Sequence, residues 1–274
     1  MLVGLNAYLD TGEALENMMI RLASGVCMFW FMAAIASAAG IEQTTPDERV
    51  FESLRSVSPE SEIAEIRYHD GIAMFYFQTD TGVDGYISPD GQYIMPSRLL
   101  KVEENGLLQD DTKSRVLQDI LDLESENFLV FQNPSIEQKG SVIVFGDVTC
   151  EYCSLFHNRI KQINDAGISV KYLLYPRAGI NSTSALLMSE VMCSESPHNS
   201  FDKAIKALGV SVELKGVRQP CDSSLVEQAY LKGKALDIKG TPAFIFEDGV
   251  VRNAYMMPED VIDYALSKRA KVAQ

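Results

Sequence analysis

Two cysteines three positions apart, placed between an apolar run and a helical pattern, constrain the fold of this chain more than any other feature. Ser141–Phe145 is typical of a buried strand, and a helix is predicted to begin near Cys150, so Cys150 and Cys153 fall in its first turn. Strand and helix patterns alternate from there to the end of the sequence. Such alternation predicts an α/β domain with a mixed sheet. A Cys-x-x-Cys pair at this place is typical of redox chemistry.

Periodicity and turn residues predict the other elements of this domain. A second strand is expected at Val170–Tyr175, and a hairpin turns at Asp248-Gly249 between Ala243–Glu247 and Val250–Arg252. Four further helices are expected, at Ser182–Met192, Phe201–Leu208, Ser223–Leu236 and Pro258–Lys268.

A smaller α+β unit precedes this domain. Residues 46–58 have apolar positions at helical spacing, which predicts a short first helix. Four short strands separated by turn residues follow, at Ile63–Tyr68, Ile72–Gln78, Val83–Ser88 and Gln92–Met95. A sheet this small buries little core by itself, which favours a homodimer held mainly by residues 63–102.

The two units are joined by residues 103–112 (EENGLLQDDT), which are polar and interrupt the strand pattern. Thr112 is a suitable N-cap for a helix over Lys113–Glu126, which carries an apolar stripe. This helix is either a semi-rigid spacer between domains or simply the first helix of the second domain.

The position of Cys150 predicts that it is the attacking thiol. A helix N-terminus offers free N–H groups and a partial positive charge, which stabilise a thiolate. Cys153 lies one turn further along and can attack a mixed disulfide to release the partner. Three alternatives remain: a structural disulfide, a metal site that adds His157, or two merely buried thiols.

An uncharged segment near the start predicts export. Residues 22–39 carry no charge and follow Arg21, and the small residues Ala36 and Ala38 suit a signal peptidase, so cleavage is expected near Ala38. A retained membrane anchor is the alternative. Cleavage would remove Cys27 and leave four of the five cysteines, an even number that fits an oxidising compartment.

Charge excludes one class of function. The chain has 24 Lys and Arg against 38 Asp and Glu, for a net charge of −14. A nucleic-acid binder needs a basic face to neutralise phosphates, so no nucleic-acid partner is expected.

Thr241 and Pro242 stand directly before the apolar strand that begins at Ala243. Proline at a strand entrance usually marks an edge or a turn. In a thioredoxin-like fold, however, a cis-proline here lies against the active cysteines. The backbone before it then offers hydrogen bonds to an extended substrate, and we expect the cis isomer.

Together these motifs resemble the DsbC/DsbG family of bacterial periplasmic thiol:disulfide interchange proteins. The order of the motifs matches the family: Phe145-Gly-Asp-Val-Thr-Cys-Glu-Tyr-Cys153, His157, Tyr175-Pro-Arg177, Cys193, Cys221 and Gly240-Thr-Pro242. The resemblance is closer to DsbC because of Tyr152 and Thr241. It covers essentially the whole chain after the export segment and is weakest between about residues 40 and 70.

The resemblance implies a V-shaped homodimer and a separate role for each part of the chain. The catalytic pair would be Cys150 and Cys153, the substrate contacts Thr241 and Pro242, and the structural disulfide Cys193–Cys221. The implied domains are an upstream extension and signal peptide (1–38), a small cystatin-like α+β dimerisation domain (39–105), a linker helix (106–128) and a thioredoxin-like catalytic domain with a helical insertion (129–274).

The sequence departs from the family at two positions. Glu151 stands where the DsbC type usually has glycine, and Ser154 where histidine is common. A carboxylate beside Cys150 should oppose the thiolate, although exposed charges are screened. Glu151, Tyr152 and His157 are therefore the candidate residues for tuning the redox pair.

The predicted function is rearrangement of non-native disulfides in exported proteins, without a metal or cofactor. Misoxidised exported proteins would be the substrates, and the resemblance implies a membrane electron-donor protein that reduces the active site in the periplasm. A dedicated reductase or oxidase serving a secretion or conjugation apparatus is one alternative. A chaperone whose cysteines are incidental is another.

Overall fold

The structure is a computed structural model that describes residues 45–96, 98–104 and 107–272. The predicted export segment, with Ala38, lies outside these residues. Within them, no helix is both long enough and apolar enough to cross a bilayer.

A five-stranded mixed sheet of order β11-β10-β8-β9-β7 forms the centre of the larger unit. Strands β8 and β9 are parallel, and the other neighbouring pairs are antiparallel. The carboxyl ends of β8 and β9 therefore meet at one edge, where the cysteine loop follows β8. The strands are Leu129–Phe131 (β7), Gly140–Gly146 (β8), Ile168–Leu174 (β9), Ala243–Phe246 (β10) and Val251–Arg252 (β11).

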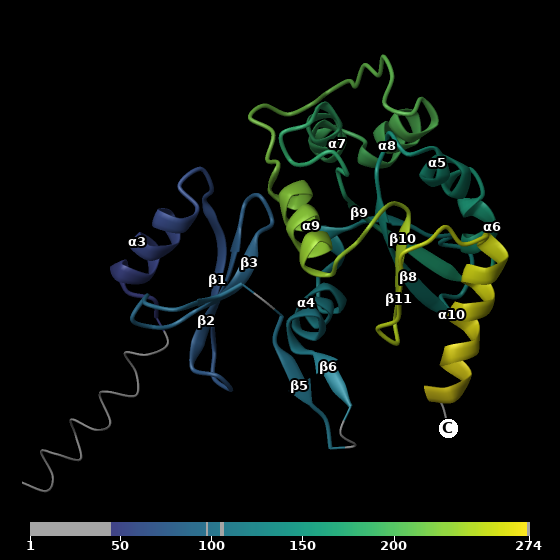
Figure 1. Ribbon diagram of the computed structural model, residues 1–274. Helices are drawn as coiled ribbons and strands as arrows, with labels where there is room; N and C mark the ends of the chain where they lie inside the picture. Colours follow the sequence, from purple (N-terminus) through teal and green to yellow (C-terminus); the bar gives the residue numbers. More distant parts are fainter. Residues whose placement is uncertain (1–44, 97, 105–106, 273–274) are drawn as a thin grey trace, which may run out of the picture.

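Helices cover both faces of this sheet (Figure 1). Val142 and Val144 of β8 face a core shared with α5, α7, α8 and α10, while Ile143 and Phe145 face a second core shared with α4 and α9. The helices are Asp111–Leu121 (α4), Glu151–His157 (α5), Ile160–Asp165 (α6), Thr183–Cys193 (α7), Pro197–Lys206 (α8), Ser224–Ala235 (α9) and Pro258–Val272 (α10). The predicted mixed α/β domain is confirmed.

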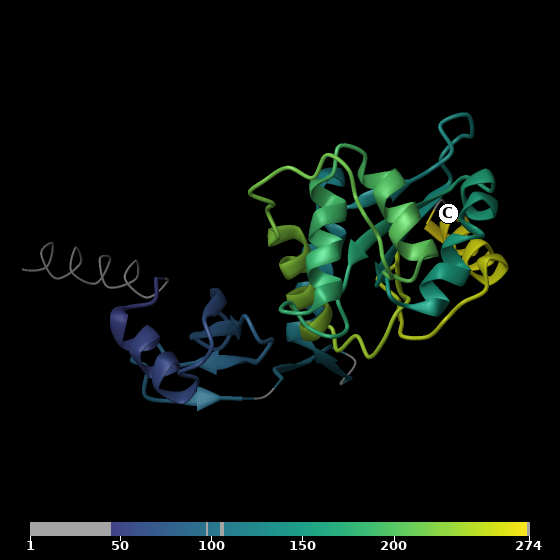
Figure 2. The ribbon, with the colours of Figure 1, turned by 90° about the horizontal axis from the view of Figure 1, so that it is seen from above.

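The smaller unit packs one helix, α3 (Glu48–Val57), on a four-stranded antiparallel sheet of order β1-β2-β3-β4. Val50 and Leu54 of α3 are fully covered by the apolar side of this sheet. The strands are Ile63–His69 (β1), Met74–Thr79 (β2), Asp84–Ile87 (β3) and Ile94–Met95 (β4). The unit lies to one side of the larger one, next to α4 and α9 (Figures 1 and 2).

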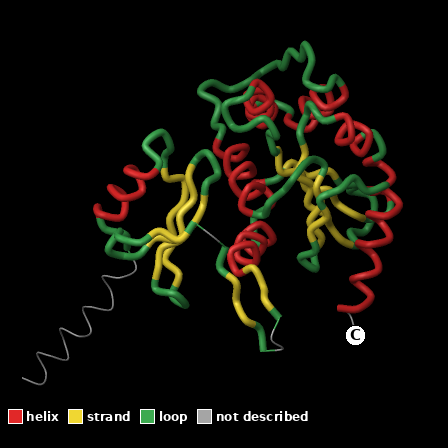
Figure 3. The backbone as a smooth tube through the Cα atoms, viewed as in Figure 1, coloured by secondary structure: helices red, strands yellow, loops and turns green. Residues whose placement is uncertain are grey.

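The segment expected to break the pattern instead forms a hairpin. Leu100–Val102 (β5) and Leu108–Asp110 (β6) pair as antiparallel strands, shown in yellow below α4 in Figure 3. Alternation in such short strands is too brief to stand out in a sequence. Two other elements were also not predicted, namely strand β7 and helix α6.

The helix that follows the hairpin begins and ends earlier than predicted. Asp110, not Thr112, caps α4, because its carboxylate accepts the Lys113 backbone N–H at 3.0 Å. Val116 and Ile120 of α4 belong to the core on the larger sheet. This packing supports the interpretation of α4 as the first helix of the second unit. The chain leaves the helix after Leu121, and a 3₁₀ turn follows at Ser125–Asn127.

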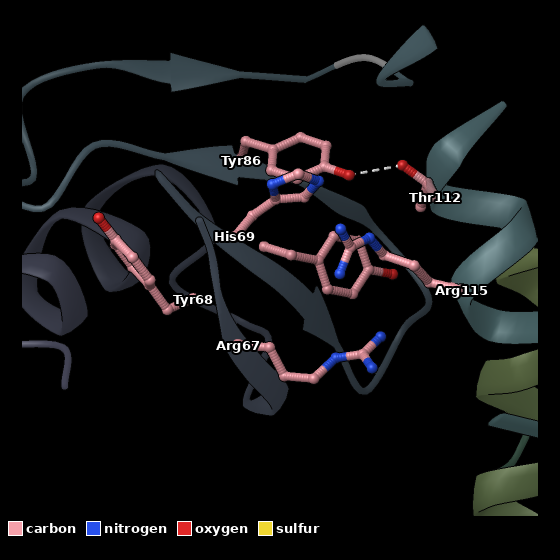
Figure 4. A pocket seen from close by; sticks show the side chains of 7 residues that line it. Arg67, Tyr68, His69, Tyr86, Thr112 and Arg115 are labelled. Carbon is pink, nitrogen blue, oxygen red and sulfur yellow. Dashed lines mark hydrogen bonds between the residues drawn. The ribbon is translucent and has the colours of Figure 1, made fainter. Parts of the chain in front are cut away.

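Polar contacts join the small sheet to α4. Arg67 donates to the Asp119 carboxylate at 2.9 Å, and Tyr86 and Thr112 share a hydroxyl–hydroxyl hydrogen bond of 2.6 Å. A cavity of about 40 Å³ remains between them (Figure 4), lined by Arg67, Tyr68, His69, Tyr76, Tyr86, Thr112 and Arg115. Thr112 therefore has a role different from the one predicted, since it joins α4 to the small unit.

Cys193 at the end of α7 is joined to Cys221, which lies just before α9. The two residues form a disulfide with a Cα–Cα distance of 5.7 Å. It ties the helical insertion to the segment that leads back towards the sheet.

We expect the Cys193–Cys221 disulfide to stabilise the protein by about 3–4 kcal/mol, because it restricts a 28-residue separation in the unfolded chain. Replacing both residues with alanine should lower the free energy of urea unfolding by that amount. The Cys193→Ala variant alone should lose a similar amount. Peptide mapping of the purified protein that found either cysteine as a free thiol would contradict the prediction.

Candidate active site

The cysteine motif occupies the turn between β8 and α5. Cys150 is the N-cap of α5: its backbone is extended, and its sulfur accepts the Cys153 N–H at 3.4 Å. The preceding loop is held by Asp147, whose carboxylate accepts the Thr149 N–H at 2.8 Å and the Thr149 hydroxyl at 2.7 Å. The sequence thus places Cys150 where the orphan N–H groups of a helix point.

The segment before β10 covers the same sulfur. Strand β10 pairs with β8 so that Ala243 lies opposite Phe145, which brings the preceding residues to the cysteine loop. The Thr241–Pro242 peptide bond is cis, as expected from the sequence. The Cys150 thiol donates to the Thr241 carbonyl at 3.1 Å. Residues about ninety positions apart in the sequence therefore meet at one sulfur.

The pKa of Cys150 is strongly lowered, from its ordinary 9.0 to about 5. The largest contribution is a hydrogen bond from the Cys153 thiol, and Thr241, the Cys153 N–H and the charge of Arg177 act in the same direction against burial. The sequence suggested that the helix N-terminus is the main cause of the lowered Cys150 pKa. In the structure the Cys153 N–H contributes to this lowering, but the hydrogen bond from the Cys153 thiol contributes more.

The second cysteine is shifted the opposite way. Burial raises the pKa of Cys153, and the neighbouring Cys150 raises it further. Cys153 is 1% exposed. A thiolate is therefore favoured on Cys150, and its proton-bearing partner lies behind it in the core.

Arg177, which follows the end of β9, completes the electrostatics of the loop. Its backbone N–H and its Nε donate to the second Asp147 carboxylate oxygen at 3.0 and 3.3 Å. Asp147 is buried, and both of its oxygens accept hydrogen bonds. In the sequence, Arg177 was named only as part of the Tyr175-Pro-Arg177 motif. Its place directly after β9, the strand parallel to β8, was the signal that could have assigned it to the site.

His157 lies one helical turn after Cys153 and is buried. Its Nε2 contacts the Asp202 carboxylate at 2.6 Å, and its Nδ1 contacts the Tyr172 hydroxyl at 3.1 Å. Burial lowers the pKa of His157, and Asp202 opposes this shift. Both ring nitrogens are engaged, which leaves none for a metal ion. In the described part of the chain, no group of metal-binding side chains is present.

The other two tuning candidates lie outside the buried pair. Glu151 is exposed and is not among the main groups that shift the Cys150 pKa. Tyr152 is also exposed and packs its ring on Tyr255, with ring centres 5.6 Å apart. Exposed apolar side chains on the same helix and on nearby segments belong to Tyr152, Leu155, Leu186 and Met257.

Comparison with known proteins agrees with this geometry. Residues 132–268 match the family model of the thioredoxin-like domain. The chain is 32% identical to the thiol:disulfide interchange protein DsbC of Haemophilus influenzae over 184 residues, which cover 67% of this chain and 75% of that protein. It is 28% identical to the Salmonella typhimurium DsbC over 234 residues (85% and 92% covered) and 25% identical to the Escherichia coli K12 DsbC over 243 residues (89% and 95%).

The fold and the paired cysteines thus define a thiol:disulfide oxidoreductase with a thioredoxin-like domain. More specifically, the chain belongs to the DsbC family of thiol:disulfide interchange proteins.

We expect the reduced protein to show a thiolate absorbance transition near pH 5, the lowered pKa of Cys150. Since this pKa is lower in the folded protein than in the unfolded chain, the reduced form gains stability as pH rises from about 5 towards 9 and loses it as pH falls through about 5. Absorbance titration and urea unfolding of the reduced protein measure both effects.

The Cys150→Ser variant should lack the transition. Because Glu151 is exposed, Glu151→Gln should move the midpoint by less than about half a pH unit. A midpoint near the ordinary thiol value, or a large shift in Glu151→Gln, would contradict this account of the site.

Proposed function

We propose that the protein is a periplasmic disulfide isomerase in which Cys150 attacks and Cys153 resolves. The observation that carries the proposal is the opposite shift of two adjacent thiols. The pKa of Cys150 is lowered to about 5, whereas that of Cys153 is raised. At neutral pH Cys150 is therefore the nucleophilic thiolate, whereas Cys153 remains a protonated thiol.

The proposed reaction begins with attack of the Cys150 thiolate on a substrate disulfide. One substrate sulfur forms a mixed disulfide with Cys150, and the other leaves as a thiolate. The freed substrate thiolate can then attack a different substrate disulfide and finally displace Cys150, which is isomerisation without net redox change. Alternatively, Cys153 attacks Cys150, the substrate leaves reduced, and the pair becomes a disulfide, which is reduction.

Thr241 and Pro242 are the proposed substrate contacts. The Thr241 carbonyl already lies 3.1 Å from the Cys150 sulfur, so a substrate strand bonded there would present its cysteine to the nucleophile. The exposed apolar residues near the pair, among them Tyr152 and Leu186, suit the apolar segments that a misfolded protein exposes.

The compartment and the electron source complete the proposal. The predicted leader with cleavage near Ala38 and the membership of the DsbC family support a periplasmic location. Misoxidised exported proteins would be the substrates. An isomerase needs a reduced Cys150, so we propose a membrane electron-donor protein as its second partner.

Refolding of a scrambled disulfide-bonded protein distinguishes the candidate functions. We expect catalytic amounts of the reduced protein to restore native disulfides, and Cys150→Ala to abolish this activity. Cys153→Ala should retain part of it and accumulate mixed disulfide, because the resolving thiol is missing. Thiol release without recovery of the native fold would indicate a dedicated reductase. Full activity of Cys150→Ala would indicate a chaperone with incidental cysteines.

The β5–β6 hairpin supports the proposed homodimer. Val102 and Leu108 lie opposite each other across the hairpin and are 67% and 64% exposed. Leu100, two residues before Val102, shares this face and is 51% exposed. An exposed apolar face on a short unprotected hairpin favours pairing with a second copy.

We therefore expect light scattering to show a dimer, and Val102→Lys together with Leu108→Lys to shift it towards the monomer. Val210→Lys is the matched control, because Val210 is equally exposed (68%) but lies beyond α8 in the larger unit. A monomeric parent would refute the proposed dimer. A double variant that dimerises as tightly as the parent would refute the hairpin as part of its interface.

A further inference from the structure

A groove opens beside the cysteine loop, between α7 and the segment that follows α8. Its volume is about 300 Å³, which is enough for one long side chain. Thr149, the residue directly before Cys150, is part of its lining. A substrate side chain that entered this groove would therefore be close in the substrate sequence to the cysteine under attack.

One wall of the groove is a single face of α7. Its lining residues are spaced by three and four positions, so they lie on one side of the helix: Thr183, Leu186, Leu187 and Glu190. Leu186 is 63% exposed, and Leu187 packs against the core of the larger unit. The two leucines form an apolar stripe, and Glu190 adds a carboxylate one turn further along the same face.

The opposite wall comes from the segment after α8, which packs closely on the cysteine loop. Gly209 has a φ of +72°, and a side-chain carbon added to it would lie only 2.9 Å from the Thr149 methyl group. Both facts favour glycine at this position. Helix α8 itself packs against α5 and α7 (Figures 1 and 2). The groove is thus built against the residue that precedes the nucleophile.

Glu190 determines the charge of the groove. It is the one charged residue among the described residues that line the groove, and it is only partly exposed. Its carboxylate has no hydrogen bond or ion pair with any residue that the structure describes. At the start of α7 the Ser182 hydroxyl accepts the Ala185 N–H at 3.2 Å, so that N–H is not free to bind an anion. The groove therefore favours a cation.

An apolar stripe that leads to an unpaired carboxylate matches the two parts of a basic side chain. The methylene groups of lysine or arginine can lie along Leu186 and Leu187, and the charged end can bond to Glu190. The net charge of −14 for the whole chain also favours the approach of basic segments.

We propose that this groove binds a lysine or arginine side chain that lies close in sequence to the substrate cysteine, with Glu190 as the specificity-determining residue. The inference rests on the proposed function, because it names the class of substrate segment that the same site prefers. Thr241 and Pro242 would contact the backbone of the substrate, whereas the groove would hold one of its side chains. The groove then changes which disulfides Cys150 attacks fastest, not the reaction itself.

Peptide disulfides with a coloured leaving group measure this preference. Each peptide has one cysteine bonded to thionitrobenzoate and carries lysine, norleucine, glutamate or alanine at one position within about three residues of it. Cys150 attacks the peptide sulfur and releases thionitrobenzoate, the better leaving group, so the absorbance gives the rate constant of attack. Norleucine keeps the hydrocarbon stem of lysine but lacks its charge.

At the position that reaches the groove, the lysine peptide should react about three-fold or more faster than the norleucine peptide, and salt should reduce this difference. Glu190→Gln should remove the difference, and Glu190→Lys should make the glutamate peptide the faster one. Glu213→Gln is the matched control, because Glu213 is exposed on the segment after α8 but does not line the groove. It should keep the lysine preference.

The apolar part of the groove is tested separately. Leu186→Ser should slow the lysine and norleucine peptides by a similar factor relative to the alanine peptide, since both lose the contact with the stem. Retention of the parent's rates for both peptides would contradict the proposed path along α7.

Equal rates for the lysine and norleucine peptides at every position would overturn the inference. A lysine preference that survives in Glu190→Gln, or a parent that prefers the glutamate peptide, would overturn it too. If the parent releases thionitrobenzoate from all peptides no faster than Cys150→Ser does, the proposed function itself fails.

Discussion

The parallel pairing of β8 and β9, with β10 antiparallel on the other side of β8, is the constraint on which the site depends. It brings three chain segments to one edge of the sheet: the cysteine loop after β8, Arg177 after β9, and Thr241 before β10. All three segments meet around the Cys150 sulfur and the loop that carries it. The Cys150 sulfur lies against the Thr241 carbonyl, and Arg177 binds the carboxylate that shapes the cysteine loop. A shift in register of any one strand would separate these groups.

The chemistry of the pair follows from different surroundings within one helical turn, since both cysteines are buried. Cys150 caps the helix and receives hydrogen bonds, so its thiolate is stabilised. Cys153 points into the core, so its thiolate is disfavoured. An enzyme that forms a mixed disulfide and later resolves it needs two thiols of different pKa, one to attack and one that stays protonated until the resolving step. The difference arises from hydrogen bonds, burial and one nearby positive charge.

The sequence predicted those parts of the fold that depend on local patterns. The alternation of strands and helices and the place of Cys150 at a helix start could be inferred from periodicity. Two contacts distant in sequence, that of Thr241 with Cys150 and the Cys193–Cys221 disulfide, were expected from the resemblance and not from periodicity. Other distant contacts could not be inferred. Thr112 looks like an N-cap, but its hydroxyl is used by Tyr86 on the small sheet, and Asp110 caps the helix instead. The β5–β6 hairpin was missed because each strand has only three residues.

The same limit applies to the site. The spacing of Cys153 and His157 on one helix was visible, but not the partners of the imidazole, because Tyr172 and Asp202 come from β9 and α8. The effect expected of Glu151 rested on adjacency in sequence. The first turn of α5 instead turns Glu151 to solvent, so the residue nearest in sequence to Cys150 matters less than Thr241.

Mapping the adduct that the reduced Cys153→Ala variant forms with a scrambled substrate protein tests the central claim most directly. Without the resolving thiol, the mixed disulfide should persist, and digestion with mass spectrometry should find the substrate linked through Cys150. Cys193 and Cys221 should remain paired with each other. A substrate linked through Cys193 or Cys221, or the absence of any adduct, would contradict the assignment of Cys150 as the attacking thiol.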